Sequence, residues 1–340
     1  MTTKTERKLT TQKAIAEAIA TEMRDDGSVF VMGEDIGTYG GIFGATEGLL
    51  AEFGTERVID TPISETGFIG AAIGAAVNGM RPIVELMFVD FFGVCMDQIY
   101  NNMAKIHYFS GGNINVPVVL TTAVGGGYSD AGQHSQTLWG TFAHLPGMKV
   151  VIPSNPHDAK GLMISAIRDD NPVVYMFHKG VLGLGWMTNN PRATGVVPEE
   201  PYEVPIGKLN VAREGNDLTI ATVGLSVHKA LDAAEALTEK GVSAEVLDLR
   251  SLVPLDREGI LTSVEKTHRL LVVDEDYHSF GMSAEIATTA VEGAFDYLDA
   301  PPVRVTTPDI PIPYSHPLEE WALPSVERIV EASSSLLVAG

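Results

Sequence analysis

The chain has 340 residues, with 45% hydrophobic and 20% charged side chains and a formal net charge of −21 at pH 7. This length predicts about two domains, each large enough to bury a core of its own. Because nucleic acids and anionic membranes bind basic surfaces, the charge argues against both as partners. It is compatible with a basic protein partner, although acidic surfaces more often serve only solubility.

Helical and strand-like patterns alternate through the first half of the chain. Apolar residues at helical spacing predict helices at residues 10–24, 46–53, 67–79, 93–105, 135–144 and 156–168. Short apolar runs between them predict strands at residues 29–32, 57–63, 82–88, 116–124, 148–152 and 172–178. Regular alternation of this kind indicates a mostly parallel sheet that helices cover on both faces.

The alternation stops near residue 185, where prolines, asparagines and glycines replace the apolar pattern, and we interpret residues 186–207 as an interdomain linker. Beyond the linker, strands are expected at 218–223, 243–249, 269–274 and 303–306, and helices at 226–240, 256–266, 281–296 and 324–332. The predicted fold class is α/β with two domains, residues 1–185 and 208–340, each a mostly parallel sheet flanked by helices.

The single cysteine, Cys95, excludes an intramolecular disulfide and favours a reducing compartment. Its apolar surroundings, GVCMDQI, predict a small buried side chain rather than a nucleophile. The N-terminus lacks the apolar region of a signal peptide, and no segment approaches the roughly 18 uninterrupted apolar residues of a membrane span. We therefore expect a cytoplasmic protein without a membrane partner.

One stretch, DTPISETG at residues 60–67, joins a short apolar strand to a helix rich in glycine and alanine. Ser64 is placed to cap that helix. Glu65 follows in the first turn, at the carboxyl end of a parallel strand, where open α/β sheets bind their ligands. A carboxylate there suits acid or base chemistry, or it only complements the helix dipole, and the local pattern alone favours the second interpretation.

Polar and aromatic residues follow three other strands of the same predicted sheet. Glu34 ends the first strand, the segment MFVDFF at residues 87–92 ends the third, and the glycine-rich loop at 125–136 follows the fourth and contains His134. In a parallel sheet these loops share one edge, so we expect two carboxylates, a histidine and several aromatic rings to converge there.

Several catalytic signatures are absent from the sequence. It contains no GxxxxGK[ST] loop, no GxGxxG after a strand, no HExxH, no paired CxxC and no GxSxG. Kinases, NAD enzymes of the usual type, zinc hydrolases and serine hydrolases are therefore disfavoured.

Five ordered motifs carry a resemblance to a known family. They are DTPISETGFIGAAIGAA, MFVDFFGVCMDQIYN, AGQHSQ, PGMKVVIPSNPHDAKGL and AIRDDNPVV, and DLRSLVPLD and LLVVDED extend the match into the second domain. Together they resemble the β subunits of thiamin diphosphate-dependent 2-oxo acid dehydrogenases over nearly the whole chain. The resemblance implies a transketolase-like pyrimidine-binding domain followed by a domain similar to the transketolase C-terminal domain.

The resemblance also implies roles for individual residues. Glu65 would be the catalytic glutamate that hydrogen-bonds the cofactor's aminopyrimidine and supports its proton relay. The remaining cofactor-binding residues would be Glu34, Ile63, Met87 and Phe91, with the ring of Phe91 stacked on the pyrimidine. His134 would act near the reacting carbon, in proton transfer or lipoyl reduction. Without the resemblance, Met87 and Phe91 would be interpreted as ordinary core residues.

A structural potassium ion is implied by the AIRDDNP motif, held by Val118, Ala166, Ile167, Asp169 and Asn171, and such an all-oxygen site suits a hard cation. The chain lacks the GDG…NN pattern that holds diphosphate and Mg²⁺ in this superfamily. The resemblance assigns both to an α subunit in an α2β2 heterotetramer, for which the helix at residues 67–76 is a natural interface.

Within the family, the segments ELMFVDFFGVCMDQIYN and GGGYSDAGQHSQ resemble acetoin dehydrogenase β subunits. A negative charge at Asp90 would suit neutral acetoin better than an anionic 2-oxo acid. The expected reaction cleaves acetoin to acetaldehyde and passes the acetyl unit to the lipoyl group of a dihydrolipoamide acyltransferase. Oxidative decarboxylation of pyruvate or a branched-chain 2-oxo acid is the alternative.

A non-catalytic docking scaffold is the alternative from another class. Its acidic surface would consist of Asp274, Glu275, Asp276, Asp299, Glu319 and Glu320, which are otherwise simply solvated.

Overall fold

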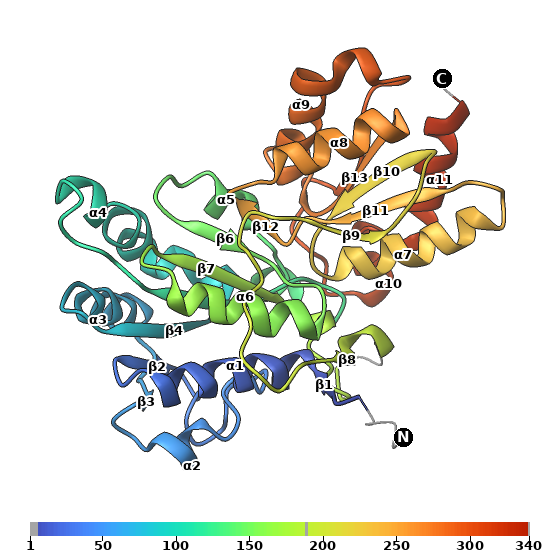
Figure 1. Ribbon diagram of the computed structural model, residues 1–340. Coiled ribbons are helices and arrows are strands. Elements are labelled where there is room, and N and C mark those ends of the chain that lie inside the picture. The colour runs from blue at the N-terminus through green and yellow to red at the C-terminus, as the bar shows by residue number, and fades with distance from the viewer. Residues whose placement is uncertain (1–5, 188–189, 339–340) are drawn as a thin grey trace, which may run out of the picture. The chain divides into compact units, whose positions relative to one another are not determined.

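The computed structural model describes residues 6–187 and 190–338 and divides into two compact units (Figure 1). Among these residues, the first unit comprises those up to Val124 and those from His144 to Ile206. The second unit comprises residues 125–143 and those from Gly207 onward. The outer ends of the two expected domains, and residues 188–189 of the expected linker, lie outside the described residues.

Six strands of the first unit form a parallel sheet in the order β6-β7-β5-β4-β2-β3 (Figure 1). They are β2 (Val29–Gly33), β3 (Val58–Asp60), β4 (Arg81–Phe88), β5 (Val119–Val124), β6 (Lys149–Val151) and β7 (Val173–His178). The helices of this unit are α1 (Thr11–Asp25), α2 (Leu49–Phe53), α3 (Glu65–Val77), α4 (Ile106–Phe109) and α6 (Pro156–Arg168).

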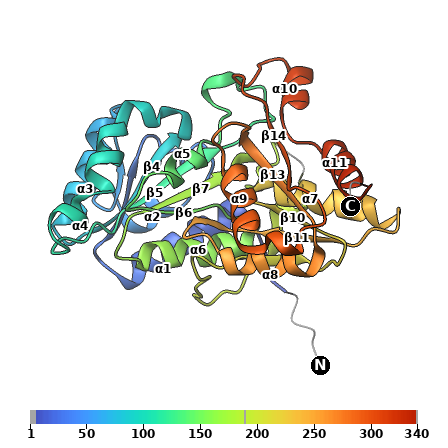
Figure 2. The same ribbon diagram turned by 90° about the horizontal axis from the view of Figure 1, so that it is seen from above.

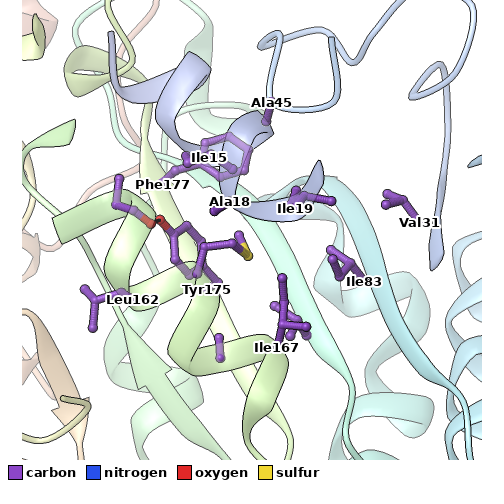
Figure 3. Packing of buried hydrophobic residues seen from close by; sticks show 14 of the residues in the cluster. Ile15, Ala18, Ile19, Val31, Ala45, Ile83, Leu162, Ile167, Tyr175 and Phe177 are labelled. Atoms are coloured by element: carbon purple, nitrogen blue, oxygen red, sulfur yellow. Dashed lines mark hydrogen bonds between the residues drawn. The ribbon is translucent and has the colours of Figure 1, made fainter. Parts of the chain in front are cut away.

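The core of the first unit lies between the sheet and the paired helices α1 and α6 (Figure 3). Ile15 of α1, Ile83 of β4 and Tyr175 of β7 are each at most 1% exposed in this cluster. Tyr175 remains satisfied in the core because its hydroxyl donates to the carbonyl of Ala159, at 2.8 Å. The helix α3 packs against β4, so helices flank the sheet as predicted.

Residues 93–103 are helical, as expected, but the helical segment begins earlier and is irregular. A 3₁₀ helix, η1 (Val89–Cys95), starts directly after β4, and a wide π-helical turn, η2 (Gln98–Met103), follows it. Met96 and Asp97, both in α-helical conformation, join η1 to η2, so the segment is one irregular helix.

The interval that the sequence marks as a linker carries structure of its own. A 3₁₀ turn, η5 (Pro191–Ala193), leads into β8 (Thr194–Val196), which pairs antiparallel with β1 (Lys8–Thr10). Val204 is buried in the core of the first unit. Residues 190–206 therefore belong to the first unit rather than to a free connection.

The second unit contains a five-stranded sheet in the order β14-β13-β10-β11-β9, in which only β9 is antiparallel to its neighbour. The strands are β9 (Asn210–Arg213), β10 (Leu218–Thr222), β11 (Ala244–Asp248), β13 (Leu270–Tyr277) and β14 (Val303–Thr307), and a short strand β12 (Ser251–Val253) follows β11. Neither β9 nor β12 was expected.

Helices cover the sheet of the second unit, with α7 and α11 packed together and α8 and α9 packed together (Figure 2). Their bounds are α7 (Leu225–Thr238), α8 (Arg257–Thr267), α9 (Met282–Ala294), α10 (His316–Ala322) and α11 (Val326–Val338). The short helix α10 was not expected. In the described part of the chain, no helix is long and apolar enough to cross a membrane.

The segment 125–143 leaves the first unit after β5 and packs within the second unit before the chain returns to β6. It contains the 3₁₀ turn η3 (Ala131–Gln133) and the short helix α5 (Trp139–Ala143). Sequence alternation had assigned this segment to the first half of the molecule.

Candidate active site

Residues at the carboxyl ends of three neighbouring strands form the candidate site of the first unit. Glu34 follows β2, Glu65 begins the helix after β3, and Phe91 lies in η1 directly after β4. Because β3, β2 and β4 are adjacent and parallel, these three ends lie at one edge of the sheet. This is the convergence that the sequence predicted for the first unit.

The turn that carries Glu34 is tied to the end of β3. The carboxylate of Asp60 accepts hydrogen bonds from the backbone amides of Gly37 and Thr38, at 2.6 and 3.1 Å. The amide of Thr61 donates to the carbonyl of Gly33, at 2.9 Å. Asp60 thus fixes the loop after β2, a role that the sequence analysis missed although a polar residue at a strand end is its signal.

Glu34 is buried, at 8% exposure, and its Oε1 atom has no hydrogen-bond partner in the described structure. Burial and the nearby charge of Glu65 raise its pKa, and a hydrogen bond from the amide of Ser64 opposes the rise. The two carboxyl groups are therefore close enough to interact.

Glu65 is half-buried as the first residue of α3. The expected cap by Ser64 is wrong, because its hydroxyl donates to the carbonyl of Pro62 at 3.0 Å instead. The helix therefore starts without a side-chain cap, and the amides of Gly67 and Phe68 donate to the carbonyl of Ser64, at 2.8 and 3.0 Å.

The apolar residues expected at the site are only partly covered. Ile63 is 85% exposed, and Met87 and Phe91 are half-buried, so none of them is an ordinary core residue. The ring of Phe91 meets that of Phe88 edge to face, with centroids 5.5 Å apart, and Phe88 meets Phe43 in the same way. The half-buried Phe88 thus contacts Phe91 and is itself packed on the buried Phe43.

The sequence analysis also made predictions for two further residues of η1, Cys95 as a buried thiol and Asp90 near the substrate. Cys95 is 1% exposed, and burial together with the charge of Glu65 raises its pKa to about 12, so it is the inert buried thiol that the sequence predicted. Asp90 is half-buried, with its Oδ2 atom shielded from solvent. Its expected place in a substrate pocket remains a prediction.

Glu85 in the middle of β4 is a buried acid that the sequence analysis missed. It is 3% exposed, its Oε1 atom has no partner, and burial raises its pKa to about 7. Its backbone pairs with Gly33, where an added Cβ would lie 3.0 Å from the Glu85 carbonyl oxygen. A single glutamate within the apolar run of β4 was the feature of the sequence that could have indicated this buried acid.

His134 belongs to the second unit, in the segment 125–143. It is half-buried and directly follows η3. The residues expected to bind the cofactor, by contrast, all belong to the first unit.

The expected potassium ligand Asp169 follows the last residue of α6. Its Oδ1 atom accepts from the backbone and side-chain nitrogens of Asn171, both at 2.9 Å, and Lys149 forms an ion pair with its Oδ2 atom. Although burial opposes the effect, these contacts lower the pKa of Asp169. The carboxylate is thus ionised and already has one cationic partner.

The carbonyl ligands expected for potassium also have protein donors. The carbonyl of Val118 accepts from the amide of Val173, and that of Ile167 accepts from Arg81, both at 2.9 Å. Ala166 lies beside Ile167 in the last turn of α6, where the helix dipole favours a cation. Each carbonyl oxygen has two lone pairs, so one hydrogen bond leaves room for a second partner. The potassium site itself stays a prediction.

The acidic docking surface considered for the second unit is not present. Four of its six members are at most 6% exposed, namely Asp274, Glu275, Asp276 and Glu319. Only Asp299 and Glu320 are exposed. The buried carboxylates instead accept hydrogen bonds from the segment 125–143.

Comparison with known families identifies the class of protein. Residues 7–183 match the transketolase pyrimidine-binding domain, and residues 207–329 match the transketolase C-terminal domain. A solved structure described as a split-gene transketolase, inactive β4 tetramer, superposes with a TM-score of 0.77 at 22% identity, covering 97% of this chain and 99% of that one. The fold and the strand-end carboxylates therefore define a two-domain protein of the transketolase type.

Curated relatives narrow the class. The chain is 46% identical to the β subunit of acetoin:2,6-dichlorophenolindophenol oxidoreductase from Bacillus subtilis, covering 95% of this chain and 96% of that protein. The Cupriavidus necator protein of the same name is also 46% identical, over 98% and 99% of the two chains. The Rickettsia felis pyruvate dehydrogenase E1 β subunit is 44% identical, over 95% and 97%.

The chain belongs to the family of E1 β subunits from thiamin diphosphate-dependent dehydrogenase complexes, and it is thus an oxidoreductase component. Since its relatives are β subunits of multi-subunit enzymes, an α partner is implied.

Proposed function

We propose that this chain is the β subunit of the thiamin diphosphate-dependent component of an acetoin dehydrogenase complex. The component would cleave acetoin to acetaldehyde and pass the two-carbon unit to the lipoyl group of a dihydrolipoamide acyltransferase. The interacting pair Glu34 and Glu65, at the ends of adjacent parallel strands, carries the proposal. Relatives named for acetoin, at 46% identity, support this substrate, and those named for pyruvate, at 44%, keep pyruvate as the second candidate.

The first unit fits the pyrimidine half of the cofactor on three counts. Glu34 has a buried Oε1 atom without a partner, which a bound polar group would satisfy. Ile63 exposes an apolar side chain, and Phe91 and Met87 are half-buried, so apolar surface is available beside the carboxylates.

Thiamin diphosphate, when bound, supplies a nucleophilic carbon for attack on a carbonyl group. Glu65 would hold or accept a proton at its carboxylate, beside the pyrimidine ring. Glu34, whose buried Oε1 atom has no partner in the described structure, would hydrogen-bond a polar group of the ring beside Glu65. Phe91, Ile63 and Met87 would orient the ring and exclude water.

The proton role of Glu65 is tested by Glu65→Gln, which keeps the shape of the side chain and removes its titrating oxygen. In the complex reconstituted with the α subunit, thiamin diphosphate and Mg²⁺, we expect kcat for dye reduction to fall roughly 10²- to 10⁴-fold. Glu56→Gln, an exposed glutamate of the same unit, is the control. Full activity of Glu65→Gln would reject the assignment.

The substrate is tested in the same assay with acetoin, pyruvate and branched-chain 2-oxo acids at equal concentration. A negative Asp90 near the substrate would favour neutral acetoin, so Asp90→Asn should improve the relative kcat/KM for pyruvate. A wild-type preference for a 2-oxo acid would establish the second candidate and remove the argument from Asp90.

The α partner would supply the sites for the diphosphate and Mg²⁺ in an α2β2 heterotetramer, and α3 would contact it. Gly67, Ala71 and Gly74 form an exposed face of small residues on this helix, which permits close backbone approach. Gly74→Arg should therefore abolish co-purification with the α subunit, whereas Ala51→Arg on the exposed face of α2 should not. Unchanged co-purification of Gly74→Arg would exclude α3 from the interface.

We also propose a cytoplasmic location, which rests on the single cysteine.

A structural potassium ion at the end of α6 is also part of the proposal. Because Lys149 and Arg81 already contact the same group of oxygens, the ion's contribution should be small. A thermal midpoint that is higher in KCl than in choline chloride, and unchanged by the salt in Asp169→Asn, would support the site. Equal midpoints in both salts would remove it.

A further inference from the structure

The segment 125–143 begins with four consecutive backbone amides that donate to buried carboxylates of its own unit. Gly127 and Ser129 donate to the two oxygens of Glu319 at 2.8 Å, and Tyr128 donates at 3.3 Å. The amide of Gly126 donates to Glu275 at 2.9 Å. The triple-glycine loop is therefore held in place rather than freely flexible.

The far end of the segment is held in the same way. The indole nitrogen of Trp139 donates to Asp274 at 3.0 Å, and the amide of Gly140 donates to Asp276 at 3.1 Å. An added Cβ at Gly140 would lie 3.1 Å from the accepting oxygen, so the approach is as close as glycine allows. Both ends are thus anchored, and His134 lies midway between Ser129 and Trp139.

The backbone between these anchors is strained. Ser129, Ala131 and Leu138 have φ values of 57°, 59° and 48°, in the left-handed region that residues with a Cβ rarely adopt. Such a conformation persists only where the surroundings over-determine it, and strained positions cluster at functional sites. The hydrogen bonds to Glu319 immediately precede the first two of these residues.

We propose that Glu319 is a positioning residue for His134: its buried carboxylate, on α10, fixes the strained loop that sets where the histidine lies. The proposal rests on the proposed function, because it requires a catalytic role for His134. Glu319 is fully buried and turns both of its oxygens to the loop.

The neighbouring residue provides a matched control. Glu320 lies on the same helix but is exposed, with its side chain near His316. Glu319→Gln and Glu320→Gln remove the same charge from adjacent positions, but only Glu319 is buried and contacts the loop. The amide that replaces Glu319 retains one acceptor oxygen for the three donors.

The first measurement is amide hydrogen exchange of the reconstituted complex, which needs no turnover. Glu319→Gln should accelerate exchange at residues 127–129, whereas Glu320→Gln should leave it unchanged. Unchanged exchange in Glu319→Gln would overturn the proposal.

The second measurement is a double-mutant cycle with His134→Ala, using kcat and KM for dye reduction with acetoin. Glu319→Gln alone should lower kcat roughly 10- to 100-fold with little change in KM, because the histidine is displaced. In the His134→Ala background the same change should lower kcat by less than about twofold, since its target is gone. An equal loss in both backgrounds would overturn the positioning role.

The double-mutant cycle tests the catalytic role of His134 and the positioning role of Glu319 separately. If His134→Ala keeps full kcat, the catalytic role of His134 is wrong and the positioning proposal falls with it. If His134→Ala is impaired while Glu319→Gln is not, the proposed function stands and only the role of Glu319 is overturned. Loss of activity in Glu65→Gln reports on the proposed function independently of both outcomes.

Discussion

Glu85 places a carboxyl group among apolar neighbours without a hydrogen-bond partner for its Oε1 atom. Its pKa rises from 4.5 to about 7 in the folded chain, so the folded state binds more protons than the unfolded state between these values. Stability must then fall as pH rises through this window, by roughly 3 kcal/mol on the relation between pKa shift and free energy.

Replacing Glu85 by glutamine should remove this pH dependence. The wild-type urea midpoint should fall from pH 5 to pH 8, and the Glu85→Gln midpoint should fall less, because the neutral amide does not titrate. Glu56→Gln, whose side chain is exposed, should keep the wild-type slope. Parallel slopes for wild type and Glu85→Gln would show that Glu85 does not titrate in this window.

At the scale of elements, two helical glycines differ in the space that an added side chain would find. Gly74 of α3 has nothing within 4 Å of an added Cβ, whereas at Gly161 of α6 that atom would lie 2.4 Å from Val204 and 2.9 Å from Tyr202. Gly74→Ala should therefore stabilise the chain by about 0.5–1 kcal/mol through lower backbone entropy. Gly161→Ala should destabilise it by about 1–3 kcal/mol through overpacking.

Urea unfolding of the two variants measures this contrast directly. A rise in both midpoints would mean that helix propensity, rather than packing, decides the effect at these positions. Because both substitutions are glycine to alanine within a helix, each is the control for the other.

The elements that the sequence predicted best are those with local signals. The helix α6 begins and ends where expected, because Asn155 accepts from the amide of Asp158 and Pro156 favours the first turn. The short elements β9 and α10 carry too few residues to show a period. Ser64 has the right residue type for a cap, but its hydroxyl donates to the carbonyl of Pro62 and accepts no hydrogen bond from the helix.

The candidate site likewise contains residues with a local sequence signal and contacts without one. Glu34, Glu65 and Phe91 were predictable because strand ends in a parallel sheet share an edge and the motifs resemble a known family. The hydrogen bonds from Gly127 and Ser129 to Glu319 were not predictable, because contacts between residues about 190 positions apart leave no local pattern in the sequence. Such contacts are determined by tertiary packing alone.

At the scale of the whole molecule, the chain passes between its two units three times, after Val124, after Ala143 and after Ile206. A protease site inserted between residues 206 and 207 would cut only the last of these connections. We expect the cleaved halves to elute together in size-exclusion chromatography, because the segment 125–143 of the first half stays anchored in the second. Separation of the halves without denaturant would contradict this anchoring.

This threading also limits how such proteins can exchange parts. A chimera that joins the first 206 residues of one family member to the remainder of another would combine a loop from one parent with carboxylates from the other. Four buried acids, Asp274, Glu275, Asp276 and Glu319, would then face a foreign backbone. The second unit is therefore built from two separate stretches of the sequence. A recombinant protein that receives this unit intact must carry residues 125–143 along with residues 207–338.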